Sequence, residues 1–366
     1  MKVLLIGFAK IKYMPYMHFY LNQIDRTQHE LHLLYWNRDC LREELPQGVR
    51  CHEFAWSMED DIPKVNKLRG FYQYRKYALS LLKKEKFDFI VIMHSLPGVL
   101  LGRYLSQHYR GKFIFDYRDE TYERFSFYRR MIHKLVHDAY ATFVSSDGFR
   151  ALLPDLDNIY TSHNVFADAE DRRRQFAYRE DGPLRIAFWG YIRHEQLNRA
   201  IIRQLADDSR FQLHFYGREQ AIALSLKEYA AQLGAGNVFF HGEYCPGEQD
   251  DFAAQTDLLH NLYSNTEAPS QKLAMTNKYY DGLVYRLPQI CMTGSFMGQK
   301  VKKEGLGLVC DPLSPDFGDK LWEYYHALDC EAFCRSCDQM LTQVLNEYKE
   351  GRSVIENAVA NANTKE

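Results

Sequence analysis

The feature that most limits the folds open to this chain is a run of apolar residues at 89–93, directly after Asp88. A strand that faces solvent on one side alternates apolar and polar residues, whereas a strand covered on both faces of a parallel sheet is apolar throughout. Similar runs recur along the first half and alternate with longer segments of helical period, such as 64–84. Repeated strand–helix units of this kind predict a doubly wound parallel sheet.

The same alternation continues through most of the chain. The expected strands span residues 2–6, 30–35, 49–54, 87–93, 112–116, 142–145, 184–189, 211–216, 238–240, 258–263, 288–291 and 306–309. The expected helices span residues 16–25, 64–84, 97–109, 125–139, 147–153, 195–206, 219–233, 248–254, 275–285, 297–304, 316–328 and 331–348. The small, polar stretch 357–366 is expected to fray.

A break in this pattern divides the chain. Its 366 residues predict two domains at about 150 residues each. Residues 167–183 are polar and charged and end in Gly-Pro, which is typical of a linker. We therefore expect two Rossmann-like α/β domains of parallel sheets, at 1–166 and 184–345, facing a central cleft, with a tail at 346–366.

Composition places the chain among ordinary globular proteins. Apolar residues make up 46% and charged residues 26%, which excludes collagen, coiled coil and extensive disorder. The net charge of −2 gives no reason to expect nucleic-acid binding. It divides unevenly, because residues 1–165 carry +5 and residues 166–366 carry −7. This asymmetry suggests that the two domains meet different partners, although a chance fluctuation would look the same.

Cysteine usage and the N-terminus favour the cytoplasm. The eight cysteines are scattered and are expected to be free thiols. Cys330, Cys334 and Cys337 have helical spacing but lack a further ligand pair nearby, which disfavours zinc. The first apolar run is too short for a signal peptide, and no stretch approaches the length of a membrane span.

The nucleotide-binding motifs that the sequence lacks, and those that it contains, limit the functions to be expected. Neither the strand at 2–6 nor that at 184–189 is followed by Gly-x-Gly-x-x-Gly, and no phosphate loop occurs, so dehydrogenases and P-loop kinases are disfavoured. Lys278 and Asp281 are three positions apart on an expected helix and therefore share a face. Lys278 is suited to phosphates and Asp281 to a ribose diol. The turn at Gly294 opens another helix, whose N-terminus suits a diphosphate.

These motifs, in this order, resemble the donor half of GT-B glycosyltransferases, and most of all bacterial family 1/family 4-like enzymes of capsular and surface polysaccharide synthesis. The resemblance covers nearly the whole chain and implies that Asp281, seven positions before Pro288, holds the ribose. The supporting segments are 88–94, 116–119, 145–164, 188–193, 213–217, 238–243, 278–281, 286–288 and 305–309.

The resemblance also implies roles for individual residues. In residues 184–345 it implies a donor site made of Arg193, Gly217, Glu243, Tyr244, Lys278, Asp281, Gly294 and Ser295, with the base near Glu243 and Tyr244. In residues 1–166 it implies His94 and Asp119 as catalytic residues and Gly7 and Arg118 as acceptor-binding residues.

The chain departs from the family at several positions. Leu273 stands where many retaining members carry a second Glu, and Tyr191 and Gln196 stand where basic residues are usual. Arg193 and Lys278, or alternatively Lys272, would compensate for the missing cations. The stereochemistry stays open: an inverting enzyme would use Asp119 or His94 as the base, whereas a retaining enzyme needs no dedicated base.

The expected activity is transfer of a hexose from a nucleotide sugar, with a UDP-sugar favoured, to a saccharide acceptor that is free or lipid-linked. Neither a cofactor nor a metal is expected, because cations with helix ends would stabilise the leaving nucleoside diphosphate. Two alternatives are a nucleotide-sugar 2-epimerase and a non-catalytic scaffold of a polysaccharide-assembly complex. The scaffold hypothesis is motivated by Leu273.

One further segment suggests a surface role. Residues 124–137 combine arginines, a lysine and histidines with Phe125, Phe127 and Met131 in an amphipathic pattern. Such a segment is suited to peripheral contact with the inner face of an anionic membrane or to a lipid-linked pyrophosphate, but it also fits an ordinary surface helix.

Overall fold

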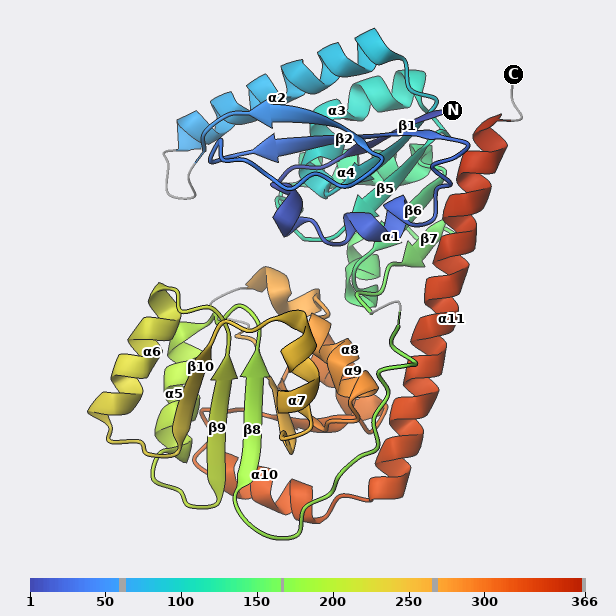
Figure 1. The fold of residues 1–366 in the computed structure, drawn as a ribbon. Coiled ribbons are helices and arrows are strands. Elements are labelled where there is room, and N and C mark those ends of the chain that lie inside the picture. Colours follow the sequence, from blue (N-terminus) through green and yellow to red (C-terminus); the bar gives the residue numbers. More distant parts are fainter. Residues whose placement is uncertain (59–63, 166–167, 265–268, 364–366) are drawn as a thin grey trace. The chain divides into compact units, whose positions relative to one another are not determined.

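The computed structural model describes residues 1–58, 64–165, 168–264 and 269–363. The chain forms two compact units: unit 1 is Met1–His163 with Asn346–Glu366, and unit 2 is Asn164–Leu345. Each unit contains one parallel sheet with helices packed against it (Figure 1). The fold class predicted from the sequence, two Rossmann-like parallel-sheet domains, is confirmed.

The sheet of unit 1 has seven parallel strands in the order β3-β2-β1-β4-β5-β6-β7. The direction of strand order reverses between β1 and β4, and ligands of open α/β sheets bind beyond the carboxyl ends at such a point. The strands are β1 (Lys2–Ile6), β2 (Glu30–Asn37), β3 (Arg50–Ala55), β4 (Phe89–Met93), β5 (Phe113–Tyr117), β6 (Ala141–Val144) and β7 (Ile159–Thr161). The short β7 was not predicted.

Helices cover both faces of this sheet. On one face, α1 and the end of α11 share a core with β1, β2, β4 and β6, and that core includes Phe19, Phe143 and Ile355. On the other face α3 packs against both α2 and α4 (Figure 1). The bounds are η1 (Ile11–Tyr13), α1 (Met17–Leu21), α2 (Lys64–Glu85), α3 (Ser95–His108), α4 (Ser126–Asp138), η2 (Asp147–Leu152) and α11 (Cys330–Asn363).

The last helix is longer than the sequence suggested. We expected it to end at residue 348 and residues 346–366 to form a tail, but α11 continues to Asn363. The reason is a stripe of apolar residues at helical spacing, Ile355, Ala358 and Val359, which are all buried in the core of unit 1. Ala358 and Val359 lie between Asn357 and Asn361, so the polar composition concealed the stripe.

The sheet of unit 2 has six parallel strands in the order β10-β9-β8-β11-β12-β13. Its reversal lies between β8 and β11. The strands are β8 (Leu184–Trp189), β9 (Phe211–Tyr216), β10 (Val238–Gly242), β11 (Leu258–Asn261), β12 (Gln289–Met292) and β13 (Gly307–Cys310). The helices are α5 (Glu195–Leu205), α6 (Ala221–Gln232), η3 (Pro246–Glu248), α7 (Gln249–Ala253), η4 (Pro269–Leu273), α8 (Asn277–Val284), α9 (Phe296–Lys303) and α10 (Phe317–His326).

The described part of the expected linker, residues 168–183, belongs to unit 2. Phe176 packs on Phe333 at 5.4 Å between ring centroids, and Tyr178 stacks on Tyr325 at 5.1 Å. These rings hold the extended segment against unit 2 although most of its neighbours are polar. Among the described helices, none is both long enough and apolar enough to cross a bilayer.

We predict that Ile355→Ala lowers the free energy of unfolding by roughly 2–5 kcal/mol, because the side chain is fully buried and its removal leaves a cavity. Urea denaturation followed by circular dichroism measures the change. Glu356→Ala is the matched control, because Glu356 is exposed on the next position of the same helix. Equal stabilities of the two variants would contradict the packing of α11 described above.

Candidate functional site

A tryptophan and a carboxylate meet at the carboxyl end of the second sheet. Trp189 is the last residue of β8, and its indole N–H donates to Oδ2 of Asp281 over 2.7 Å. Asp281 lies on α8 and is only 4% exposed. Burial raises the pKa of this carboxyl to about 6, and the Trp189 hydrogen bond and Lys278 only partly oppose that shift. The predicted ribose-binding residue is therefore a buried acid held by an indole.

Lys278 lies one turn before Asp281 on α8 and points to the same strand end. Its ammonium donates to the carbonyl of Trp189 over 2.9 Å and to the hydroxyl of Tyr263 over 2.8 Å. The Nζ atom also lies 4.0 Å from the ring centroid of Phe188, within cation–π range. A Cβ atom on Gly190 would lie 3.9 Å from this nitrogen, so the cation sits beneath the turn that follows β8.

Glycines let neighbouring strand ends approach one another at this point. A Cβ atom on Gly217 would come within 2.2 Å of the carbonyl oxygen of Gly190, so no side chain fits there. Gly190 itself has a φ of +107°, in the region that favours glycine. The Gly217 N–H donates to the carbonyl of Gly242 over 2.8 Å. Main-chain hydrogen bonds and close main-chain packing thus join the ends of β8, β9 and β10.

A buried polar network fixes the turn before α5. His260, in β11, donates from Nε2 to the Asn198 side chain over 3.0 Å, and its Nδ1 accepts the N–H of Leu262. Burial lowers the pKa of His260 to about 3, so it stays neutral. Asn198 in turn donates to the carbonyls of Arg193 and His194. This network sets where the main chain at Arg193 stands.

The remaining predicted donor residues lie on the loops that follow these strands. Arg193 is exposed, and its guanidinium lies 4.9 Å from the ring centroid of Tyr191. Glu243 is exposed directly after β10. Tyr244 contacts Phe252 edge to face at 5.0 Å, and Phe252 contacts Trp189 at 5.4 Å. A chain of ring contacts therefore links Tyr244 to the Trp189–Asp281 pair.

Gly294 and Ser295 form the turn after β12. Gly294 has a φ of +79° and is exposed. The hydroxyl of Ser295 caps α9, since it accepts the N–H of Gly298 over 2.9 Å and donates to the carbonyl of Met292 over 2.8 Å. The side chain of Ser295 is therefore already bonded, and its predicted contact with a donor stays a prediction.

In unit 1, His94 stands at the carboxyl end of β4. It has a φ of +85°, which is unusual for a residue with a side chain and marks local strain. Its Nδ1 atom lies 3.8 Å from Oδ2 of Asp119, which is 68% exposed. Its Nε2 atom contacts the hydroxyl of Tyr16. Burial lowers the pKa of His94. The two residues predicted to be catalytic are thus neighbours.

The two predicted acceptor-binding residues have structural contacts. Arg118 is 6% exposed; its guanidinium pairs with Asp116 over 3.1 Å and donates to Ser162 over 3.2 Å. Gly7 is buried, and a Cβ atom there would come within 2.4 Å of the Met14 sulfur. Their roles in acceptor binding stay predictions.

Several residues of these sites escaped the sequence analysis. Trp189 and Tyr263 hold Lys278 and Asp281, His260 and Asn198 hold the turn at Arg193, and Tyr16 contacts His94. His260 left a signal, since it and Asn261 are polar residues between the apolar residues of the expected strand 258–263. Tyr16 left none, because it lies 78 positions from its partner.

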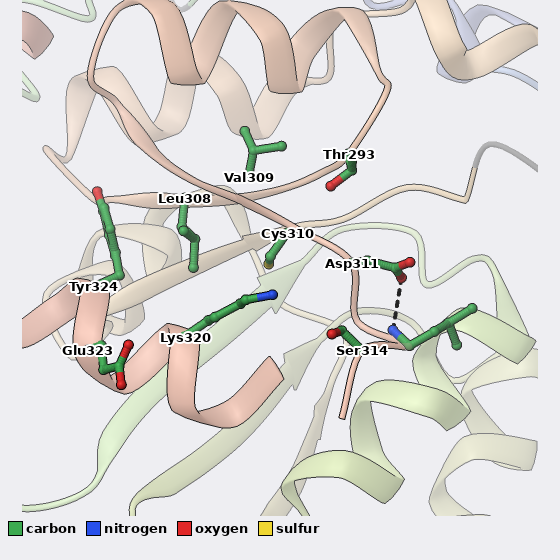
Figure 2. Close-up of a pocket in the computed structure, with 10 residues that line it drawn as sticks. Thr293, Leu308, Val309, Cys310, Asp311, Ser314, Lys320, Glu323 and Tyr324 are labelled. Atoms are coloured by element: carbon green, nitrogen blue, oxygen red, sulfur yellow. Dashed lines mark hydrogen bonds between the residues drawn. The ribbon is translucent and has the colours of Figure 1, made fainter. Parts of the chain in front are cut away.

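A separate pocket of about 600 Å³ opens beside β13 and α10 (Figure 2). Figure 2 shows Lys320 reaching from α10 toward Cys310 and Asp311. Burial raises the pKa of the Cys310 thiol to about 12, so it is not a reactive thiolate. The lining is Thr293, Leu308, Val309, Cys310, Asp311, Leu313, Ser314, Lys320, Glu323 and Tyr324. Its two carboxylates outnumber its one ammonium, which disfavours a diphosphate there.

In the part of the chain that the structure describes, no three or more His, Cys, Asp and Glu side chains gather as metal ligands would. The three cysteines near the start of α11 are free, and burial raises the pKa of Cys337 well above its ordinary value. Independence from a metal stays a prediction.

No protein-family model matches the chain, and no curated protein matches its sequence. Its fold is similar to solved GT-B structures. One is an E. coli trehalose-6-phosphate protein bound with UDP-2-fluoro glucose (TM-score 0.66, 10% identity, 99% of both chains). Another is Anabaena HepE with UDP and glucose (0.64, 12%, 100% of both). A third is WaaG, a lipopolysaccharide glycosyltransferase (0.62, 13%, 97% of this chain and 99% of that one).

The raised pKa of Asp281 predicts a pH-dependent effect of Asp281→Asn. The pKa of this carboxyl is about 6 in the folded protein, compared with an ordinary value of 3.8. The protonated carboxyl therefore stabilises the folded state at low pH, and this stabilisation is lost as the pH rises through about 6. We expect the stability of Asp281→Asn relative to the native protein to rise by roughly 1–2 kcal/mol between about pH 5 and pH 8. Urea denaturation measures it, with the exposed Asp251→Asn as control. A pH-independent difference would contradict the prediction.

Proposed function

We propose that the protein is a glycosyltransferase that moves a hexose from a nucleotide sugar, preferably a UDP-sugar, to a saccharide acceptor in surface polysaccharide synthesis. The observation that carries this proposal is the arrangement of Lys278 and Asp281 around Trp189 beneath the Gly190 turn, in a GT-B fold. It combines a cation, an acid and a closely approached main-chain turn at the carboxyl end of a sheet, which is where open α/β sheets bind ligands.

Unit 2 would bind the donor. Lys278 supplies a cation next to the main chain of Gly190, where a phosphate oxygen would replace the carbonyl of Trp189 as its partner. Asp281 accepts a hydrogen bond from Trp189 at Oδ2, and its carboxylate would also accept from a ribose hydroxyl. Arg193 is exposed on its loop and would add a second cation for the diphosphate.

The leaving nucleoside diphosphate would be stabilised without a metal. Its developing charge would lie near Lys278 and the exposed guanidinium of Arg193, and cations placed in this way lower the barrier of the transfer step. The N-terminus of α9 after Gly294 offers N–H groups of the same electrostatic sign, although the cap at Ser295 already uses one of them.

Unit 1 would bind the acceptor at the carboxyl ends of β4 and β5. Asp119 is an exposed carboxylate next to His94 and is therefore accessible to an acceptor hydroxyl. In an inverting transfer this hydroxyl loses its proton to a base as its oxygen bonds to the anomeric carbon. Asp119 would serve as such a base, because its side chain is 68% exposed and therefore open to an acceptor.

The donor proposal predicts stabilisation by a nucleotide sugar. Thermal unfolding in the presence of UDP-, GDP- and dTDP-sugars should give a raised Tm with at least one of them, and UDP-sugars are favoured. Lys278→Met should weaken that binding roughly 10- to 100-fold, since it removes a charged hydrogen-bond donor. Lys227→Met is the matched control, because Lys227 is exposed on α6 and pairs with Glu219 at the surface.

Stabilisation by none of the nucleotide sugars, with a folded protein, would overturn the proposal. NMR of the reaction products distinguishes the remaining functions. A transferase forms a new glycosidic bond only with an acceptor, an epimerase changes the donor sugar without one, and a scaffold binds the nucleotide sugar and leaves it unchanged.

We also propose that unit 1 contacts an anionic membrane surface through α4. Phe125, Phe127 and Met131 are 43%, 60% and 41% exposed, although large apolar side chains are normally buried. Arg129 and Arg130 are exposed on the same helix. Exposed rings next to cations suit the headgroup region of an anionic bilayer, where a lipid-linked acceptor would be found.

This membrane proposal predicts binding to vesicles. The protein should co-sediment with vesicles containing phosphatidylglycerol and not with pure phosphatidylcholine. The double variant Phe125→Ser, Phe127→Ser should lower the bound fraction about tenfold, because two apolar side chains are lost from the contact. Leu224→Ser, at an exposed leucine of α6, should bind as the native protein does. Equal loss in both variants, or no vesicle binding, would contradict it.

A further inference from the structure

Tyr16 lies directly before α1, and its hydroxyl contacts the Nε2 atom of His94. The two rings meet edge to face, with 5.2 Å between their centroids. We propose that Tyr16 is a positioning residue that holds His94 in the tautomer with its proton on Nδ1, so that His94 donates a hydrogen bond to a substrate oxygen and is not the base. The catalytic part of this inference rests on the proposed function, whereas the tautomer does not.

The direction of the hydrogen bond follows from what surrounds the imidazole. If Nε2 donated to Tyr16, the lone pair of Nδ1 would face the Asp119 carboxylate 3.8 Å away, and the hydroxyl proton of Tyr16 would have no acceptor among the described residues. If Tyr16 donates, the proton on Nδ1 faces that carboxylate. The second arrangement places the partial positive charge of the Nδ1–H group next to the Asp119 carboxylate, and it gives the hydroxyl proton of Tyr16 an acceptor in Nε2. It is therefore the more stable of the two.

Ionisation keeps these roles in place. Burial raises the pKa of the Tyr16 hydroxyl well above its ordinary value, so it remains a donor. Burial lowers the pKa of His94, so the neutral imidazole with one N–H persists at neutral pH. The charged groups that act on His94 are Asp119, Arg118, Asp116 and Arg38.

Tyr16 is itself held in place by Arg118. The guanidinium carbon lies 4.1 Å from the ring centroid of Tyr16, which is a cation–π contact. The Arg118 guanidinium is held in turn by the Asp116 carboxylate, 3.1 Å away, and by the Ser162 hydroxyl, 3.2 Å away. The orientation of the tyrosine, and through it that of the imidazole, is therefore set by a buried ion pair.

The consequence for catalysis is a division of roles. The lone pair on Nε2 of His94 is occupied by the Tyr16 proton, so it does not take a proton from the acceptor. In an inverting transfer the acceptor oxygen bonds to the anomeric carbon, and its proton passes to the Asp119 carboxylate. The bond between that carbon and the diphosphate breaks, and the electron pair leaves with the nucleoside diphosphate. During this step His94 donates a hydrogen bond from Nδ1 to a hydroxyl of the sugar.

Long-range ¹⁵N–¹H NMR of protein labelled at histidine tests the tautomer directly. The two ring nitrogens differ strongly in ¹⁵N shift according to which of them carries the proton, and His94→Gln identifies the signals. We expect Nδ1 to be protonated in the native protein and the proton to move toward Nε2 in Tyr16→Phe. Tyr13→Phe is the control, since Tyr13 is 61% exposed and close in sequence.

A proton on Nε2 in the native protein would overturn the proposal without any variant. An unchanged His94 spectrum in a folded Tyr16→Phe would overturn it as well. Kinetics test the catalytic part: Tyr16→Phe should lower kcat about tenfold with the KM for the nucleotide sugar unchanged, because an aligned donor is lost only in the transition state. Absence of turnover by the native protein overturns the proposed function, while the spectrum still decides the tautomer.

Discussion

Two charged side chains are almost fully buried at the carboxyl end of the second sheet, and much of the local structure compensates for that. Lys278 and Asp281 are 5% and 4% exposed, and a buried charge is costly unless it is bonded to polar groups. Trp189 provides for both, since its carbonyl accepts from the ammonium and its indole donates to the carboxylate. The end of β8 therefore contacts both side chains. Gly190 follows with a φ of +107°, and the close approach of the next strand end requires Gly217.

In unit 1, buried charges are stabilised by a direct ion pair. Arg118 and Asp116 form an ion pair in the interior, and breaking it would leave a buried charge unpaired at a large cost in free energy. Next to this pair lie His94, whose backbone is strained, and the exposed Asp119. The Arg118–Asp116 pair is buried, whereas Asp119 is exposed at the surface. In unit 2 the buried charges themselves face the candidate ligand, so a ligand there must compete with existing hydrogen bonds.

The sequence predicted the regular structure well because buried parallel strands leave a strong signal, and the runs at 2–6, 184–189 and 211–216 match the observed strands. It also predicted that Lys278 and Asp281 share a helix face, which depends only on local spacing. It did not predict the cap made by Ser295, because a serine at a turn serves a helix or a ligand equally well. The contact of Tyr16 with His94 depends on how β1 and β4 pair, which no local pattern specifies.

The course of α11 has a consequence for how the protein is made. Residues 346–363 complete the core of unit 1, although all of unit 2 is encoded before them. During synthesis the first 163 residues leave the ribosome without the helical segment that completes the core on one face of their sheet, and at 5–20 residues per second they wait on the order of ten seconds or more for it. Unit 2, which is continuous in sequence, has no such gap to bridge. The second domain to be translated is thus the first whose whole chain is present, and apolar residues on one face of the first sheet stay exposed in the interval.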